Sequence, residues 1–202
     1  MRRLLLALAL IGPAMWSGPL LAQDYEKGVE AFHRGDYATA LQEFLFFVEQ
    51  GGSSLQVMGA QFRLGYIYQE GFGVPQDYAE AIRLYRLSAE QGYAPAQSQL
   101  GTMYEHGYGM PEDSAEAAKL YRLAAEQGFR VAQRNLGVMY YYGRGIIQDY
   151  ILSHMWLNIS ASLGYEDAAD ARDIVSIKMT PDQIAEAQRL ARECVARSYK
   201  GC

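Results

Sequence analysis

Apolar and small residues recur along most of this chain at the period of an α-helix, and not with the alternation expected of a β-strand. The clearest examples are residues 60–70 and residues 78–91. Positions that would share one buried face are Ala60, Leu64, Gly65 and Tyr68 in the first segment and Ala81, Leu84, Tyr85 and Ala89 in the second. The pattern therefore predicts two amphipathic helices joined at residues 71–77, which is a helical hairpin.

The hairpin pattern occurs three times. The sequence YQEGFGVPQD at Tyr68 is followed by YEHGYGMPED at Tyr104 and YYYGRGIIQD at Tyr140, each copy 36 residues after the last. Residues 60–92 match residues 96–128 at 20 of 33 positions without a gap, and the third copy keeps the framework but lacks the proline. A fixed period of this length is typical of a helical repeat protein.

Polar residues and glycine indicate where the second helix of each hairpin begins and ends. Asp77 is expected to cap this helix, with Glu80 completing a capping box, and Asp113 with Glu116 repeats the arrangement. Gly92 suits the end of the helix, since glycine adopts positive φ without strain.

The paired glycines of the first copy, Gly71 and Gly73, allow two interpretations. A glycine-rich loop can bind a phosphate, but such a loop follows a β-strand and leads directly into a helix. Here a helix precedes the glycines and the pattern occurs three times. We therefore interpret them as turn residues, in loops that Pro75 and Pro111 stiffen by fixing φ.

The three copies are similar to a known family. The segments AQFRLGYIYQEGFGVPQDYAEAIRLYRLSAEQGY, AQSQLGTMYEHGYGMPEDSAEAAKLYRLAAEQGF and AQRNLGVMYYYGRGIIQDYILSHMWLNISASLGY resemble the Sel-one-like repeat proteins, relatives of the tetratricopeptide repeats. The resemblance implies an all-α fold, an α-solenoid of stacked antiparallel helical hairpins in which the end units act as caps. Its repeats occupy residues 60–95, 96–131 and 132–165.

Helices are expected on both sides of the repeats. Residues 23–59 are interpreted as a tetratricopeptide-like hairpin and a linker, because residues 36–51 share the cap and apolar spacing of residues 77–92. Residues 166–202 are expected to form capping helices and a tail, with a capping box at Thr180 and Gln183 before a last helix that docks on the third repeat. The apolar stripe of that helix consists of Ile184, Ala187, Ala191 and Cys194.

The first 22 residues have the layout of a secretory signal peptide. Arg2 and Arg3 precede an uncharged stretch from Leu4 to Ala22, which proline and glycine interrupt before it reaches the ~20 unbroken apolar residues of a membrane span. We expect cleavage after Ala22 and a periplasmic or secreted protein, with a retained membrane anchor as the alternative. The mature net charge of −7, from 16 basic and 23 acidic residues, argues against nucleic acid and anionic lipid surfaces as partners.

Cys194 and Cys202 are the two cysteines of the chain. In an oxidising compartment they could form a local disulfide that clips the tail to the last helix, and free thiols or an intermolecular bond are equally compatible with the sequence. Some cysteine-rich secreted members of the resembled family are associated with binding or hydrolysing β-lactams, and a disulfide braces each of their repeats. No repeat of this chain contains a cysteine, so the resemblance does not extend to that activity.

The histidines and carboxylates form no catalytic pattern. His33 precedes a turn, His106 lies at a variable helix end and is expected at the surface, and His154 replaces apolar residues and is expected to be partly buried. None has a nucleophile or a metal ligand at a suggestive spacing. We therefore predict no enzyme activity, cofactor or metal site. The framework tyrosines are expected in the core: Tyr68, Tyr85, Tyr104, Tyr121 and Tyr140.

One face of each first helix varies between copies, and positions that stacking does not require can specialise in binding. The alternative is that these residues are merely solvated. The candidate contact residues are Arg63, Tyr66 and Glu70, then Gln99, Thr102 and His106, then Asn135, Val138 and Tyr142. A second candidate patch consists of the loop tips Phe72, Tyr108 and Arg144.

These observations predict a monomeric, non-enzymatic adaptor or regulator in the cell envelope, which binds a protein or peptide on the solenoid surface. One alternative is a binder of cell-wall fragments or a weak envelope hydrolase, which would need carboxylates or histidines that converge in a pocket. Another is a membrane-tethered assembly factor that keeps its N-terminal segment.

Overall fold

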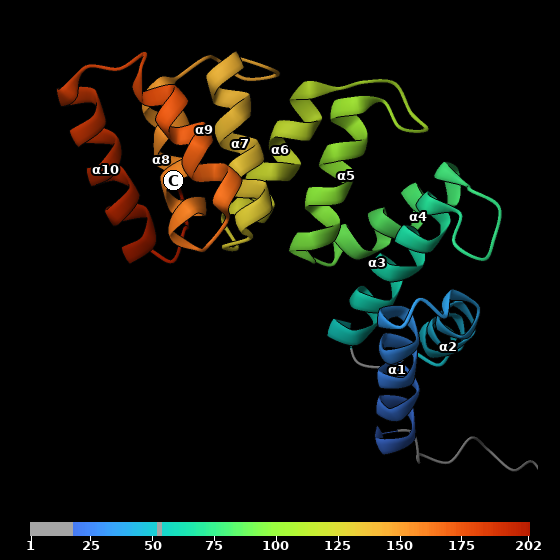
Figure 1. The fold of residues 1–202 in the computed structure, drawn as a ribbon. Helices are drawn as coiled ribbons and strands as arrows, with labels where there is room; N and C mark the ends of the chain where they lie inside the picture. The colour runs from blue at the N-terminus through green and yellow to red at the C-terminus, as the bar shows by residue number, and fades with distance from the viewer. Residues whose placement is uncertain (1–17, 52–53) are drawn as a thin grey trace, which may run out of the picture.

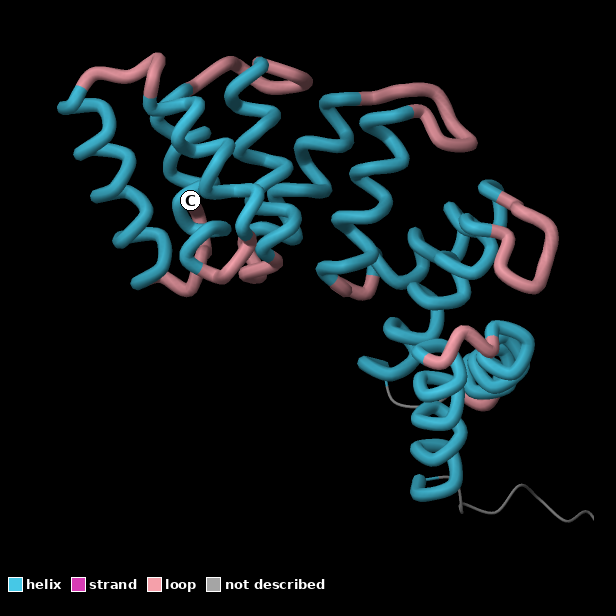
Figure 2. Tube along the Cα trace, in the orientation of Figure 1, coloured by secondary structure: helices cyan, strands magenta, loops and turns pink. Residues whose placement is uncertain are grey.

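The computed structural model describes residues 18–51 and 54–202, and this part of the chain contains helices and no strands (Figure 2). Residues 1–17, most of the predicted signal peptide, lie outside the described residues, and the first helix begins at Gly18. The helices are α1 (Gly18–His33), α2 (Tyr37–Glu49), α3 (Ser54–Glu70), α4 (Tyr78–Glu90), α5 (Ala94–His106), α6 (Ser114–Ala125), α7 (Arg130–Tyr142), α8 (Tyr150–Ser162), α9 (Glu166–Ser176) and α10 (Pro181–Ala196).

Consecutive helices pack as hairpins, α1 with α2, α3 with α4, α5 with α6 and α7 with α8. Each hairpin also contacts the next, through α2 with α3, α4 with α5 and α6 with α7. Figure 1 shows the hairpins following one another along an arc that ends at α10. The predicted all-α class and α-solenoid architecture are confirmed.

Buried tyrosines fill the space between the two helices in the first two repeats, where Tyr85 packs on Gly65 and Tyr121 packs on Gly101. Tyr85 and Tyr121 are fully buried, and Tyr140 is almost so. Each aromatic ring of this kind removes ~150–250 Å² of surface from water, so these residues are major contributors to the core. The other two framework tyrosines, Tyr68 and Tyr104, are only half-buried, so the expectation of a core position was too strong for them.

The N-terminal hairpin leads directly into the first repeat. Asp36 caps α2 as its spacing predicts, accepting a hydrogen bond from the backbone N of Thr39 at 3.2 Å. Residues 54–59, which we expected in a linker, instead form the start of α3, which has 17 residues whereas α5 and α7 have 13. The extension is held in place because Val57 packs in the core and Oγ of Ser88 donates to the carbonyl of Met58 at 2.8 Å.

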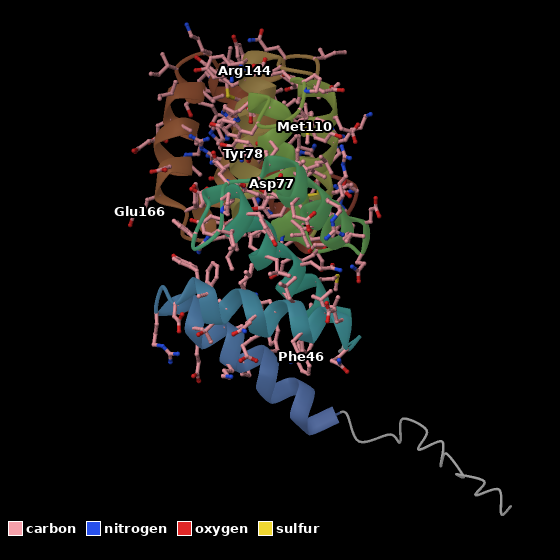
Figure 3. All side chains as sticks on the ribbon, turned by 90° about the vertical axis from the view of Figure 1, so that its right-hand side faces the viewer. Phe46, Asp77, Tyr78, Met110, Arg144 and Glu166 are labelled. Carbon is pink, nitrogen blue, oxygen red and sulfur yellow. A yellow bond between two sulfur atoms is a disulfide. The ribbon has the colours of Figure 1, made fainter. Side chains whose placement is uncertain are left out.

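The glycine loops lie along one edge of the solenoid (Figure 2). Both glycines of the first loop have positive φ, 71° and 73°, which confirms that they are turn residues. The ring of Phe72 stacks on Tyr37, the first residue of α2, at a centroid distance of 4.3 Å, and Tyr108 stacks on Tyr78, the first residue of α4, at 6.1 Å. Figure 3 shows Tyr78 and Arg144 following one another along this edge. Each loop tip therefore contacts the preceding hairpin and helps to stack the units.

The caps of the second helices differ from the prediction in one respect. Asp77 does accept a hydrogen bond from the backbone N of Glu80, at 3.0 Å. The predicted capping box is wrong, however, because the backbone N–H of Asp77 already donates to the carbonyl of Tyr68 at 2.9 Å and closes the loop. The Glu80 carboxylate pairs instead with Arg83 at 2.6 Å, and the second repeat has the same arrangement.

The C-terminal helices end the solenoid by changing the pattern. In α9, Arg172 and Asp173 occupy the positions of Leu136 and Gly137, which removes the small apolar surface on which a second helix would pack. The last helix, α10, packs chiefly on α8, the second helix of the third repeat. Its capping box is present as predicted, because the side chains of Thr180 and Gln183 each bond the other's backbone N–H. The buried residues of α10 are Ala187, Ala191 and Cys194.

A disulfide joins Cys194, which is fully buried, to Cys202 in the tail. It closes a short turn in which Ser198 and Tyr199 both have positive φ, 51° and 68°, and it brings the ring of Tyr199 against Gly128. Among the described residues we find no helix with the length and apolar character needed to cross a bilayer.

Candidate functional site

The last residue of each first helix is exposed and lies at the same end of its repeat. These residues are Glu70 in α3, His106 in α5 and Tyr142 in α7. The ring of His106 stacks on the loop tip Tyr108 at a centroid distance of 5.4 Å, and the guanidinium of Arg144 lies 4.7 Å from the ring centroid of Tyr142. The two predicted patches therefore meet in the second and third repeats. We call Glu70, His106 and Tyr142, together with the loop tips Tyr108 and Arg144, the helix-end surface.

The other six candidate contact residues are half-buried and take part in packing between units. Nη1 of Arg63 donates to the hydroxyl of Tyr25 at 3.1 Å, which ties α3 to α1. Nε2 of Gln99 donates to Oε1 of Gln69 at 2.8 Å, which ties α5 to α3. These positions vary between copies, but their side chains make contacts within the solenoid. They are therefore less available to a partner than we expected. The six are Arg63, Tyr66, Gln99, Thr102, Asn135 and Val138.

Two of the six surround a buried tyrosine hydroxyl. Tyr121 donates to Oε2 of Glu105 at 2.8 Å and lies 3.0 Å from Oγ1 of Thr102, with Asn135 beside it. Tyr85 makes the equivalent contact one repeat earlier, donating to Gln69 at 3.0 Å. Burial raises the pKa of both hydroxyls above that of an ordinary tyrosine, so they stay protonated as donors. In the first two repeats the tyrosine ring thus fills the space behind the variable face, and the tyrosine hydroxyl has hydrogen-bond partners there.

The third repeat has an open cavity at this place. Leu157 takes the position of the tyrosine and packs against Gly137, but it has neither the ring nor the hydroxyl that would reach Tyr141. The cavity measures about 190 Å³. Its walls include Arg134, Val138, Tyr141, Tyr142, Leu157 and Ile174.

The cavities on the second helices have a different character. One of about 480 Å³ lies between α6 and the third glycine loop, with Lys119 and Leu123 among its lining residues. Another, of about 260 Å³, contains Glu90 and Glu116, which is the type of carboxylate pair that a hydrolase could use. Glu116 is already paired with Lys119 at 2.9 Å, so this cavity does not present two free carboxylates.

The histidines lie apart from one another. His33 and His106 are exposed, and Nδ1 of His106 lies 3.0 Å from the carbonyl of Thr102. His154 is 2% exposed, which is more complete burial than we expected, and its Nδ1 has no hydrogen-bond partner. In residues 18–51 and 54–202 no three histidine, cysteine or acidic residues form a group that could hold a metal ion.

The family model described as the Sel1 repeat matches residues 59–93, 94–129 and 130–165, which is more than half of the chain. The protein belongs to the Sel1 repeat family. The comparison with curated proteins gives no match.

Two solved structures show the same repeat architecture. A Sel1 repeat protein from Oxalobacter formigenes is 35% identical with a TM-score of 0.59, and the alignment covers 66% of this chain and 97% of that chain. The protein c5321, a protective antigen of uropathogenic Escherichia coli strains with an SLR fold, is 25% identical with a TM-score of 0.51. That alignment covers 89% of this chain and 47% of the antigen.

Within the Sel1 repeats, the sequence pattern did not reveal the cavity or its charged residue, Arg134. One signal was available, since Leu157 departs from a framework position that Tyr85 and Tyr121 define. The change shows only that a large polar side chain is missing. Whether a neighbour fills the space depends on how α7, α8 and α9 pack, and a pattern along the chain does not contain that information.

Proposed function

We propose that this protein is a non-enzymatic adaptor or regulator of the cell envelope, which binds a protein or peptide across the helix-end surface and the cavity of the third repeat. Sel1 repeats generally mediate protein–protein interactions, and that is the general basis of the proposal. The observation that carries it to this surface is the exposed series Glu70, His106 and Tyr142, which the hairpin stack does not use. Tyr142 is 57% exposed, and exposed aromatic residues of this kind are frequent anchors at interfaces.

The proposed location in the envelope rests on the first 22 residues, whose charge and apolar core are those of an export signal. Mass spectrometry of the native protein tests it. A mature chain that begins at Gln23 supports export, and a native chain that retains residues 1–22 would contradict cleavage.

Crosslinking and affinity capture from envelope extracts test the interface. We expect the triple variant Glu70→Ala, His106→Ala and Tyr142→Ala to lose proteins that the wild type captures. A matched control changes two exposed leucines of the second helices, Leu87→Ala and Leu123→Ala, and should capture the same proteins as the wild type. If the control loses them and the triple variant does not, the partner binds the opposite helices and the proposed face is wrong.

A further inference from the structure

The cavity of the third repeat combines three departures from the first two repeats. Leu157 replaces the framework tyrosine, and Ala171 of α9 replaces the polar residue that the repeats carry at the same position. Arg134 occupies the position of Phe62 and Ser98, neither of which is charged. The first two changes leave space, and the third places an arginine among the residues that line that space.

The guanidinium of Arg134 is incompletely paired. Its Nη1 donates to Oδ1 of Asn135 at 3.3 Å, whereas its Nε is buried and has no hydrogen-bond partner. None of the ion pairs among the described residues involves Arg134. Buried donors in folded proteins nearly always have a partner, so Arg134, which lines the cavity, is a cation whose hydrogen-bonding capacity the protein itself does not use in full.

The chemistry of the walls indicates which ligand would fit. A guanidinium presents its N–H groups in a planar fork that matches a carboxylate, and Val138, Leu157 and Ile174 supply an apolar surface around it. The volume of about 190 Å³ is below the ~300 Å³ at which pockets for cofactors and drug-sized molecules begin. A single amino-acid residue with a carboxylate and an aliphatic side chain fits these constraints.

We propose that this cavity binds the C-terminal residue of a partner chain that ends in leucine, isoleucine or valine. The terminal carboxylate pairs with Arg134, and the aliphatic side chain packs against Val138 and Leu157. The preceding residues of the peptide leave the cavity past Tyr142, which is exposed on its rim. The inference rests on the proposed function, since it names the chemistry of the partner at one part of the same surface.

A chain terminus matches the cavity better than an internal acidic residue does. In a C-terminal residue the carboxylate and the side chain share one Cα, so both enter a space of single-residue size. In an extended internal segment, neighbouring side chains point to opposite faces. An internal acid and the aliphatic residue next to it would therefore not enter the cavity together.

Nuclear magnetic resonance titration tests the proposal directly, because the Nε–Hε group of Arg134 gives its own signal. The first probe is the acetylated peptide Gly-Ser-Gly-Ser-Leu with a free C-terminal carboxylate, which we expect to shift that signal in a saturable manner. The same peptide with a C-terminal amide should bind about 10-fold more weakly or worse, because it loses the charged hydrogen bonds. Equal affinities for the acid and the amide would overturn the proposal.

Two further peptides separate the parts of the ligand. Replacing the final leucine by alanine should weaken binding about 50-fold, since three carbon atoms no longer enter the apolar walls. An amidated peptide with an internal Glu-Leu pair should not shift the Arg134 signal. If it binds as well as the free acid, the carboxylate comes from a side chain and the proposed terminus is wrong.

Variants of the protein complete the test. Leu157→Tyr restores the framework residue of the other repeats and should abolish binding by filling the cavity, with stability in urea similar to that of the wild type. Arg134→Gln removes the guanidinium and with it the Nε–Hε signal, so binding to this variant is read from the backbone amide signals of Val138 and Leu157. Those signals should not shift with the leucine peptide, even if Leu157→Tyr folds poorly. Arg130→Gln, an exposed arginine on the same helix, is the matched control and should bind normally.

The failure of this inference can be told apart from failure of the proposed function. If the helix-end triple variant loses captured proteins while no peptide shifts Arg134, the adaptor function stands and the C-terminal ligand is wrong. If the leucine peptide binds and the triple variant captures the same proteins as the wild type, the cavity is a site and the helix-end surface is not the interface.

Discussion

Gln97 and Gln127 are joined by a hydrogen bond in which Nε2 of Gln127 donates to Oε1 of Gln97 at 2.8 Å. One repeat earlier, Gln91 donates to Gln61 at the same distance. Nε2 of Gln97 also donates to the carbonyl of Ala89, at 3.1 Å. The buried side-chain amide of Gln97 thus connects the start of α5 to Gln127, just after α6, and also to α4 of the preceding hairpin.

The third repeat lacks this connection, and the loss predicts two changes in stability. Leu163 replaces the donor, so Oε1 of Gln133 is buried without a partner. We expect Leu163→Gln to raise the free energy of unfolding by about 1 kcal/mol, because it supplies the missing donor. The reverse change, Gln127→Leu, should lower it by about 1–3 kcal/mol, because it leaves Oε1 of Gln97 unpaired.

Urea denaturation of both variants measures these effects. Gln188→Leu is the matched control, since Gln188 is exposed on α10, and it should change the free energy by less than ~0.5 kcal/mol. If Gln127→Leu is no more destabilising than this control, the hydrogen-bonded amides do not contribute to stacking.

The second glycine of the third loop is required by a close contact as well as by its backbone conformation. Gly145 has φ of 66°, and a methyl group there would overlap the carbonyl oxygen of Ser114 at the start of α6. Gly164 has φ of 79° with open space around it. We expect Gly164→Ala to cost about 1 kcal/mol, the strain of a left-handed residue, and Gly145→Ala to cost about 3 kcal/mol or more.

The difference between the two alanine variants isolates the contact between the loop and the preceding hairpin, since both carry the same backbone strain. It is measured as the difference in their free energies of unfolding in urea. Equal losses of stability would show that the loop does not press against α6.

The repeat sequence predicted the elements of the fold more completely than the contacts between them. Asp77 and the loop glycines define where each helix begins and ends, because caps and turns depend on a few neighbouring residues. The partner of Glu80 could not be predicted in this way, because the carbonyl of Tyr68, nine positions before Asp77, accepts the backbone N–H of Asp77 that the capping box needs. Local patterns specify local geometry, and a competing partner from a distant position is visible only after folding.

The same limit explains the result for the candidate site. Variation between copies identified Glu70, His106 and Tyr142, which are exposed, but it also selected Gln99, whose partner Gln69 lies 30 positions away. A variable position can still be structural when its partner varies with it.

The disulfide between Cys194 and Cys202 predicts a stability that depends on reductant. With a sequence separation of 8, the bond restricts a short loop of the unfolded chain, which corresponds to about 2.5 kcal/mol in the chain-entropy model. Reduction should therefore lower the midpoint of urea unfolding and release Tyr199 from Gly128. Cys202→Ala should have the lowered midpoint under all conditions and show no further response to reductant. A wild-type midpoint that is the same with and without reductant would contradict this expectation.

His154 predicts a loss of stability in mild acid. Burial is the main cause that lowers the pKa of this imidazole, and the positive charge of Arg172 lowers it further. The negative charge of Asp173 has a smaller effect in the opposite direction. The unfolded chain takes up the proton near the ordinary pKa of about 6.5, whereas the folded protein does so only at lower pH. The unfolded state thus binds more protons within this interval, so the free energy of unfolding falls as the pH drops below about 6.5. The stabilising effect of the neutral ring is fully present above that pH.

Urea denaturation between about pH 7.5 and pH 5 checks this prediction, with His154→Ala as the test variant and His106→Ala as the control. Alanine occupies the equivalent position of the second repeat, Ala118, where it is buried, so His154→Ala keeps a residue that the architecture accepts. This variant should lose less stability on acidification than the wild type, whatever its stability at neutral pH. His106 is exposed, so His106→Ala controls for the removal of an imidazole from the surface. If the curves of the wild type and His154→Ala run parallel, the buried imidazole is not the group that titrates.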